Sequence, residues 1–491
     1  MIFKKYKKSG FLVIQVLVFA SISVVVMGGL IMWGASNIKL SKRAVYREQA
    51  IQIAEAGIDY YRWHLAHAPQ DYKDGTGQPG PYTHDFTDKD GNVIGNFVLT
   101  ITPPPTGTTI VKIRSTGNVL ADPSASRTIE STLAIASFAK FAFVSNGDMR
   151  FGEGTEVFGP IHSNGGIRFD GLAHNVISSA LSSYDDPDHS GANEFAVHTH
   201  VNAPPSSGVN DTFRSAEAPP TSPVPSRPDV FEAGRQFPVP AVDFTGLTAD
   251  LAQMKSDAQS SGRYFAGSGA LGYKIVLKTT DKFDIYRVNT MVSTPNGCSN
   301  SQSQTGWGTW SVNGTTLLQS NQNFPSNGII FVEDNLWIEG TINTARLTIA
   351  SGKFPDNSST RTSITVNNDL KYTNYDGQDV LSLIAQKDIN VGMVSEDDLR
   401  IDAALVAQNG RVGRYYYGTS CKSGGNNWYT RNSITLFGML ATYNRYGFAY
   451  TDGTGYDTRQ INYDASLLYG PPPSFPLTSD QYTILSWEEI E

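Results

Sequence analysis

The N-terminal part of the chain has the clearest pattern of apolar and polar positions. Residues 11–33 contain no charged side chain, and at about 1.5 Å per helical residue this run can cross the ~30 Å hydrocarbon core of a membrane. No proline follows before Pro69. We therefore expect one long helix of more than about 50 residues, because apolar positions continue at helical spacing. These positions are Ala50, Ile51, Ala54, Ile58, Tyr61 and Leu65.

The residues in front of the apolar run are basic and favour a retained membrane helix. Lys4, Lys5, Lys7 and Lys8 precede it directly, as the positive-inside rule expects of a cytoplasmic flank. The apolar run is longer than the roughly 7–15 residues of a secretory h-region, and no clear A-x-A cleavage site follows it. A secretory signal that is cleaved off fits this pattern poorly.

Three segments downstream alternate apolar and polar residues, as half-buried strands do. They are residues 92–105, 108–120 and 125–137, and prolines and glycine separate the first two. We expect them to form a small antiparallel sheet that covers the amphipathic face of the helix.

The chain then repeats itself at intervals of roughly 20 residues, a sign of stacked structural units. SNGDMRF (145–151) recurs as SNGGIRF (163–169), and IAQKDINVG (384–392) as VAQNGRVGR (406–414). FVEDNLWIEG (331–340) and TVNNDLKYTN (365–374) share an outline of apolar residues, polar turn and strand. These repeats predict β-coils stacked as a parallel β-helix or solenoid; the alternative is a β-sandwich in which the resemblances are accidental.

Composition supports a turn-rich, mainly β downstream region. The chain has 46 glycines and 25 prolines, with a formal net charge of −8. No basic stripe runs through the downstream part, which argues against nucleic acid as a partner. Residues 202–245 are rich in Pro and Ser and predict a surface linker, and 247–262 predicts a short helix.

Ser9-Gly10 followed by Phe11 and the apolar run resembles the class III signal of type IV prepilins. The segment REQAIQIAEAGIDYYRW (47–63) is similar to the signature of PilX-type pilus-assembly proteins, and the downstream block looks like the C-terminal region often fused to such N-termini. The resemblance implies that a prepilin peptidase cuts between Gly10 and Phe11 and methylates Phe11. Pilins usually carry a glutamate at the fifth mature position, where this chain has Gln15. That departure favours a minor subunit over the repeating one, because the amide has no charge to pair with a neighbour's amine.

The expected fold class is α+β: a long pilin-like helix with a small antiparallel sheet, then a large mainly-β region of parallel β-helix or solenoid type. The expected divisions are a prepilin leader (1–10), a transmembrane and pilus-core helix (11–35), a pilin-like α/β body (36–138), first β-coils (139–201), a linker (202–245) and a C-terminal domain of short helix and solenoid-like coils (246–491).

Candidate chemistry is sparse, and we expect neither an enzyme nor a cofactor. Two acidic runs, one of Asp185, Asp186 and Asp188 and one of Glu396, Asp397 and Asp398, have the polar context of turns, where adjacent residues point to opposite faces. Five histidines fall within 39 residues: His162, His174, His189, His198 and His200. His198 and His200 share one side of a strand at a spacing compatible with a metal, but no third ligand is identifiable, so we expect no metal site.

Two further features leave alternatives open. Cys298 and Cys421 can form a disulfide in an extracytoplasmic location or stay as two free thiols. Aromatic residues of the last third either line a glycan- or surface-binding groove or pack in the core. They are Tyr415, Tyr416, Tyr417, Trp428, Tyr429, Tyr443, Tyr446 and Tyr450.

Together these features predict a minor type IV pilin-like subunit that acts in pilus assembly or priming, with adhesion at the tip as a further hypothesis. Its expected partners are other pilin subunits, prepilin peptidase, the inner-membrane assembly platform, the inner membrane, and a surface or glycan ligand. It would begin in the inner membrane with its C-terminal region outside the cytoplasm, and then move to the pilus. The alternatives are a single-pass anchored surface protein and a membrane-tethered β-helix enzyme acting on carbohydrate.

Overall fold

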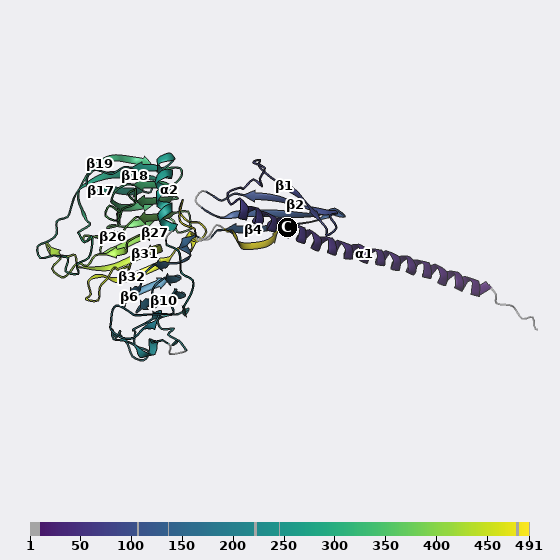
Figure 1. Cartoon of the computed structure of the whole chain (residues 1–491). Helices are drawn as coiled ribbons and strands as arrows, with labels where there is room; N and C mark the ends of the chain where they lie inside the picture. Colours follow the sequence, from purple (N-terminus) through teal and green to yellow (C-terminus); the bar gives the residue numbers. More distant parts are fainter. Residues whose placement is uncertain are drawn as a thin grey trace, which may run out of the picture. The chain divides into compact units, whose positions relative to one another are not determined.

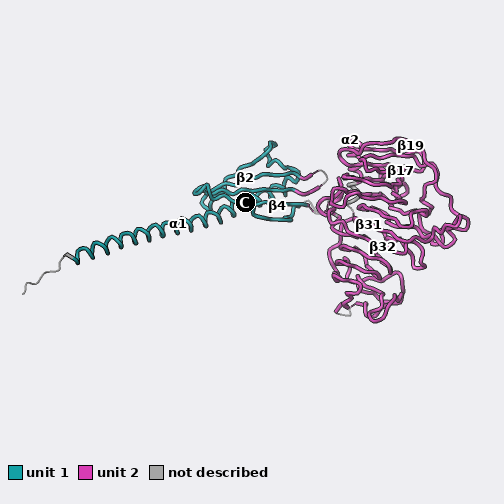
Figure 2. Tube along the Cα trace, turned by 180° about the vertical axis from the view of Figure 1, so that it is seen from behind, with its two compact units in different colours: residues 1–103, 111–134, 480–491 teal, residues 104–110, 135–479 magenta. Residues whose placement is uncertain are grey.

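The computed structural model describes residues 10–105, 108–135, 137–219, 223–244, 246–477 and 481–490. The predicted leader therefore lies outside the described residues, apart from Gly10. The chain divides into two compact units, shown in teal and magenta in Figure 2. Unit 1 consists of residues 1–103, 111–134 and 480–491, and unit 2 of residues 104–110 and 135–479. The last residues of the chain, which the sequence assigned to the downstream domain, thus belong to unit 1.

Helix α1 (Gly10–His67) confirms the predicted long helix. At about 1.5 Å per residue it is about 87 Å long, and Figure 1 shows it in purple. Its C-terminal part buries one face, made of Ala50, Ile53, Ala54, Ile58, Tyr61 and Leu65. Ile53 takes the buried position that the sequence assigned to Ile51, which is only half-buried.

The sheet of unit 1 is antiparallel, in the spatial order β1 (Tyr82–Thr87), β2 (Val93–Thr102), β3 (Val111–Val119), β4 (Asp122–Ala134) and β33 (Thr483–Ile490). The three central strands confirm the prediction. β1 and β33 were not expected. β33 carries no alternating pattern, since almost every residue in it is exposed, and its partner β4 is about 350 residues away in the sequence.

Two glycines allow α1 to lie close against this sheet. A Cβ atom on Gly117 of β3 would overlap the backbone carbonyl oxygen of Ala50, and one on Gly57 of α1 would overlap the Ser115 hydroxyl. Gly57 belongs to the AEAGI segment of the sequence. Its lack of a side chain is therefore a packing requirement between the helix and the central strand.

Unit 2 is built from parallel strands that pair laterally from one coil to the next. A first row contains, in spatial order, β16 (Arg263–Phe265), β20 (Ile329–Val332), β22 (Arg346–Ser351), β25 (Val380–Ala385), β27 (Asp398–Ala407), β31 (Thr430–Thr442), β5 (Phe143–Ser145), β8 (Ile161–Ser163), β11 (Ile177–Ser179) and β15 (Arg235–Gln236).

Two more rows complete the coils. The second contains β17 (Gly272–Lys278), β21 (Leu336–Ile342), β23 (Ile364–Thr365), β26 (Ile389–Val391) and β28 (Val412–Arg414), with β6 (Met149–Phe151), β9 (Ile167–Phe169) and β14 (Val197–His198) as a separate sheet. The third contains the end of β21, β24 (Leu370–Tyr372), the first parts of β27 and β31, β32 (Gly455–Tyr463), β7 (Thr155–Phe158) and β10 (Leu172–Ala173).

The core of unit 2 lies inside these rows. In the first row one buried apolar side chain from each coil stacks on the next: Ile330, Ile349, Leu383, Leu405, Leu440, Phe143, Ile161 and Ile177. The order of this column shows that the chain does not run through the stack continuously. The coils of residues 143–236 add to those of 263–463 where β31 pairs with β5 and β32 pairs with β7; in Figure 1 yellow strands are followed there by blue ones.

The structure tests the register of the predicted repeats. Ser145 pairs with Ser163 and Phe151 with Phe169, as the first repeat requires. Ile384 pairs with Val406, as the second requires. The third resemblance, which gave only a shared outline, joins segments of adjacent coils: Leu336 pairs with Ile364 and Gly340 with Leu370.

The remaining elements of unit 2 cover its surfaces. β18 (Lys282–Met291) and β19 (Val312–Asn323) continue the sheet from β17 in antiparallel fashion. Helix α2 (Gly246–Ser260) confirms the predicted short helix and packs Leu251, Met254 and Ala258 into an apolar cluster on the outer face of the first row. Short 3-10 helices are η1 (Phe138–Lys140), η2 (Ser215–Glu217) and η3 (Ala465–Leu467).

Part of the region predicted to be a linker belongs to the coils. Val230 and Phe231 are buried in the core of unit 2, and β15 pairs in parallel with β11. The high Pro and Ser content conceals this strand in the sequence, because β15 has only two residues.

We expect Gly117→Ala to destabilise unit 1 by about 1–3 kcal/mol, the usual cost of forcing an extra methyl group into a packed contact. Hydrogen exchange of the full-length chain in detergent would measure this as faster exchange in peptides covering residues 50–65. Gly34→Ala is the matched control, since open space surrounds its Cβ position. Unchanged exchange in Gly117→Ala would show that the helix does not rest on β3 as described.

Candidate metal centre

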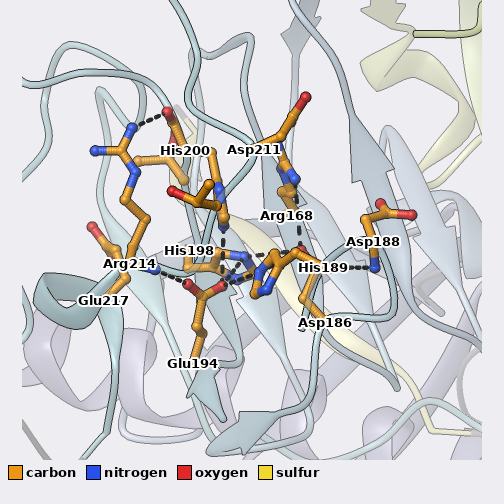
Figure 3. Close-up of polar contacts among 12 residues, drawn as sticks. Arg168, Asp186, Asp188, His189, Glu194, His198, His200, Asp211, Arg214 and Glu217 are labelled. Atoms are coloured by element: carbon orange, nitrogen blue, oxygen red, sulfur yellow. Dashed lines mark hydrogen bonds and ion pairs between the residues drawn. The ribbon is translucent and has the colours of Figure 1, made fainter. Parts of the chain in front are cut away.

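Three histidines and two carboxylates converge in the part of unit 2 formed by residues 143–236 (Figure 3). We call Asp186, His189, Glu194, His198 and His200 the His–carboxylate cluster. Each contributes one atom that can bind a metal, and all five atoms lie within 4.8 Å of one another.

A short hairpin and the strand after it bring the cluster together. β12 (Ser183–Tyr184) pairs antiparallel with β13 (Glu194–Phe195), and the loop between them carries Asp186 and His189. The Asp188 amide donates to Asp186 Oδ1 at 3.0 Å and closes a turn at the start of this loop. β14 then pairs in parallel with β9 and places His198 beside β13. The loop thus folds back over the strands that follow it.

Backbone carbonyls orient two of the rings. His198 Nδ1 lies 3.2 Å from the Phe195 oxygen, and His200 Nδ1 lies 2.7 Å from the Asn210 oxygen. A carbonyl only accepts, so Nδ1 must be the donor in both rings. In the neutral imidazole this leaves the Nε2 lone pair free to bind a metal.

The Nε2 atoms point at carboxylate oxygens (Figure 3). Glu194 Oε2 lies 2.6 Å from His198 Nε2, 3.1 Å from His200 Nε2 and 3.2 Å from His189 Nε2. Asp186 Oδ2 lies 3.4 Å from His198 Nε2 and 3.5 Å from His189 Nε2. One point is therefore surrounded by three nitrogens and two oxygens.

The cluster is closed to solvent, yet its polar atoms are not all satisfied. The side chains of Glu194, His198 and His200 are 0% exposed, and those of Asp186 and His189 are 2% and 5% exposed. Asp186 Oδ2 and His198 Nε2, which both face the centre, make no hydrogen bond of regular geometry within the described residues, although His198 Nε2 lies 2.6 Å from Glu194 Oε2. Leaving a buried polar atom unpaired is costly, so these atoms indicate that something belongs between them.

Charge interactions keep the carboxyl groups ionised. Burial raises the pKa of Asp186, but contact with His198 and the hydrogen bond from the Asp188 amide lower it more, to about 2. Burial likewise raises the pKa of Glu194, while His198 and His200 lower it well below its usual range. For His198 burial lowers the pKa, but Asp186 and Glu194 raise it more strongly. The carboxylates and the His198 ring thus stabilise each other's charged forms in a buried site.

An outer shell of polar residues supports the cluster. The Arg214 amide donates to Glu194 Oε1 at 2.9 Å, and the His200 amide donates to Asp170 Oδ1 at 2.8 Å. The buried Arg168 side chain pairs with Asp170 at 2.7 Å and with Asp211, and its nearest nitrogen lies 3.9 Å from Asp186 Oδ2. Such second-shell bonds fix ligand orientation in metal sites.

The sequence identified only part of this cluster. It predicted that His198 and His200 face the same side but supplied no third ligand, and it led us to expect no metal site. The geometry points the other way, because Asp186, His189 and Glu194 complete the group. Asp186 had been assigned to an acidic turn, and Glu194 gave no signal of its own. Only the tertiary path of the β12–β13 hairpin brings these residues together.

The other histidines of that region lie outside the cluster. His162 is hydrogen-bonded to Ser178 Oγ at 3.1 Å, and His174 lies 2.8 Å from Glu232 at the surface. Asp185 is exposed, and Asp188 forms an ion pair with Arg445.

The second acidic run, Glu396 to Asp398, lies at a turn. The carbonyl oxygen of Asp397 accepts the Asn432 and Ser433 amides at 3.0 Å, and Asp398 accepts a hydrogen bond from the Asn432 side chain at 2.6 Å. Burial raises the pKa of Glu396, and the nearby Asp369 raises it further. The three side chains themselves are exposed and do not converge on one point.

Cys298 and Cys421 form a disulfide with a Cα–Cα distance of 4.5 Å. Much of the aromatic surplus packs around it: Tyr415 and Tyr417 are buried there, and Trp428 and Tyr429 are packed against the same cluster. The buried Arg414 guanidinium lies 4.8 Å from the Tyr417 ring centroid and donates to the Met393 carbonyl at 2.9 Å. These aromatic side chains form a small core rather than an open groove.

The residues of the predicted processing site lie at the free end of α1. Gly10 is its first residue, and Phe11 is 69% exposed. Gln15 is also exposed. Within the described part of the chain, α1 is the one helix that is long and apolar enough to cross a membrane, by length and composition.

No protein-family model and no curated protein matches the chain. Among solved structures it is similar to the competence-associated pilin ComZ from Thermus thermophilus, with 13% sequence identity and a TM-score of 0.31. That match covers 90% of this chain and 97% of the other. At this TM-score the likeness decides neither fold nor function, so the assignment rests on the chain's own residues.

We expect loss of the disulfide to lower the free energy of unfolding of unit 2 by about 2–5 kcal/mol, because the bond closes a long loop in the unfolded chain. Its two cysteines are 123 residues apart. Urea unfolding of the full-length chain, followed by near-UV circular dichroism of the aromatic core, would measure the loss in Cys298→Ser/Cys421→Ser. Either single variant should lose as much as the double variant. Equal midpoints for oxidised and double-variant protein would contradict this role.

Proposed function

We propose that this chain is a minor, low-copy type IV pilin-like subunit of the PilX type, which acts in pilus assembly or priming. Its partners in this role are other pilin subunits, reached through α1, together with prepilin peptidase and the assembly platform of the inner membrane. Unit 2 is the part of the subunit that lies outside the membrane and is displayed on the pilus or cell surface. We propose no catalytic role for it.

The observation that carries this proposal is the difference between the two halves of α1. The large apolar side chains from Phe11 to Trp33 are each 50–78% exposed, whereas Ala50 to Leu65 cover the sheet of unit 1. Exposing such a run to water costs on the order of 20 kcal/mol relative to an apolar environment. The first half therefore needs lipid or other apolar helices around it. A subunit that passes from a membrane into a helical filament core meets both environments in turn.

Gln15 supports a minor position. A glutamate at this place, five residues into the processed chain, could neutralise the N-terminal amine of a neighbour in a low-dielectric core. The Gln15 amide forms hydrogen bonds but carries no charge. A subunit at the filament tip has no preceding neighbour whose amine needs a partner.

Two features of unit 2 suit an extracytoplasmic location. The Cys298–Cys421 disulfide is a bond of oxidising compartments. The three rows of parallel strands fit a β-solenoid, which is a rigid and extended scaffold. We propose that this scaffold contacts a surface or glycan, although the aromatic residues first considered for that contact lie mostly in the core.

The alternatives predict different N-termini and activities. A permanently anchored single-pass surface protein would keep Met1 or Ile2 as its first residue. A membrane-tethered enzyme acting on carbohydrate would depend on an acidic run such as Glu396 to Asp398, whose exposed side chains give no sign of a shared reaction centre.

We expect co-expression with a prepilin peptidase to yield a chain that begins with N-methylated Phe11, and Gly10→Val to block this cleavage, because the peptidase requires the small residue at the junction. Mass spectrometry of the N-terminal peptide measures both. Gly28→Val is the matched control, since Gly28 also lies in the apolar half of α1 with open space around it but is distant from the junction. It should be processed normally.

A wild-type chain that keeps its first ten residues in the presence of active peptidase would overturn the proposal in favour of the permanent anchor. Normal processing of Gly10→Val would overturn the assignment of the junction.

A further inference from the structure

We propose that the His–carboxylate cluster is a structural site for one divalent transition-metal ion, Zn²⁺ in the first instance, which fastens the β12–β13 hairpin to the coils formed by residues 143–236. The site is independent of the pilin-like role, because it lies within unit 2 and uses no residue of α1.

The spacing of the donor atoms suits an ion at their centre. Zinc binds imidazole nitrogen and carboxylate oxygen at about 2.0–2.2 Å in a tetrahedron, which places neighbouring ligand atoms about 3.3 Å apart. Asp186 Oδ2 lies 3.4 Å from His198 Nε2, and Glu194 Oε2 lies 3.1 Å from His200 Nε2. The pair of His198 Nε2 and Glu194 Oε2, at 2.6 Å, is the one of these that is much shorter than such an edge.

The hydrogen-bond pattern also calls for a cation. With Nδ1 of His198 donating to the Phe195 carbonyl, neutral His198 presents an Nε2 lone pair to the Glu194 carboxylate. Two acceptors facing each other in a dry site repel. A metal ion between them turns both contacts into bonds and gives Asp186 Oδ2 and His198 Nε2 the partners they lack.

The charges balance when a divalent ion is present. Asp186 and Glu194 bring two negative charges into a site with almost no exposed surface, and Arg168 already pairs with Asp170 and Asp211. Buried charges without partners are expensive. One divalent ion neutralises both carboxylates while all three imidazoles stay neutral.

The donor set selects the class of metal. Three imidazole nitrogens with carboxylate oxygens suit zinc and its neighbours in the first transition series, whereas Ca²⁺ and Mg²⁺ prefer oxygen alone. Because the cluster is closed, the ion has no open position for a substrate, which is the mark of a structural site. His198, His200 and Glu194 are the core ligands, since the backbone fixes each of them. Asp186, from the loop, is the fourth ligand, and His189, from the same loop, lies 3.5 Å from Asp186 Oδ2 and supports it.

The competing explanation is that protons hold the cluster together, with imidazolium rings paired to the two carboxylates. The two explanations differ in metal content. Full-length chain in detergent would be stripped with a chelator, reloaded with Zn²⁺ alone, freed of excess ion and analysed by elemental mass spectrometry. We expect about one Zn²⁺ per chain, and with Co²⁺ instead a visible absorption spectrum typical of tetrahedral nitrogen and oxygen ligands.

Variants assign the binding to these residues. We expect His198→Ala and Glu194→Gln each to weaken Zn²⁺ binding by about 100-fold or more, and His189→Gln to weaken it less. His198→Cys should recover binding, because a thiolate also ligates zinc. His174→Ala is the matched control: this histidine lies in the same coils but outside the cluster, and its loss should leave binding unchanged.

A second measurement covers the case in which a variant does not fold. In the wild-type chain, removal of Zn²⁺ should speed hydrogen exchange in peptides from residues 183–200, and Zn²⁺ should restore their protection, while peptides from residues 380–407 stay unchanged. Less than about a tenth of an equivalent of bound Zn²⁺ or Co²⁺, or exchange that ignores the metal, would overturn the proposal and leave the proton-held cluster as the answer.

Discussion

Unit 2 depends on lateral pairing between coils, because no single coil can bury its own apolar side chains. From β20 to β11, each strand of the first row supplies one side chain to a continuous column, and the column is complete only where Leu440 of β31 meets Phe143 of β5. These two residues are about 300 positions apart in the sequence. Closing so long a loop carries an entropic cost. The region with the His–carboxylate cluster is thus stabilised on one side by the pairing of β5 with β31. Its other side must be stabilised in another way.

On that other side, arginine side chains form hydrogen bonds with exposed backbone carbonyls. Strand β14 is the last of its sheet, and an edge strand exposes carbonyl groups to which another chain can pair. The guanidinium of Arg235 donates to the Val197 oxygen at 2.8 Å, that of Arg227 donates to the Val201 oxygen at 3.0 Å, and that of Arg214 donates to the His200 oxygen. Side chains therefore satisfy carbonyls of β14 and of the residues after it, and the His200 oxygen also accepts the Asn210 amide at 3.0 Å. The hairpin with Asp186 and His189 lies over the same segment, so a metal ion there would fix the final coil at the point where pairing stops.

The sequence predicted what depends on local periodicity and little of what depends on tertiary contact. Helix α1, strands β2 to β4 and the repeat that pairs Ser145 with Ser163 all follow from patterns within a short stretch. The resemblance between residues 331–340 and 365–374 identifies adjacent coils but not their register, because turn chemistry recurs at every corner of a coil. The sequence does not predict strand β33, because both of its faces are exposed and it has no alternating pattern. The sequence does not identify Glu194 as a ligand, because a single glutamate beside a phenylalanine forms no recognisable motif. Only the folded hairpin turns it toward the histidines.

Unit 2 is inserted in the chain between β4 and β33 of unit 1. Strand β33 can pair with β4 only if the two ends of the inserted segment come together, and within unit 2 they do, since Ser137 and Leu477 form an antiparallel bridge. Ser137 Oγ also donates to the Leu467 carbonyl at 2.7 Å in a buried position. In unit 1, Ala134 pairs with Thr483. Insertion at a site where the chain leaves and returns through neighbouring strands keeps the host sheet in register. The two ends of the insertion thus meet within unit 2, and the strands that flank it in the sequence pair within unit 1.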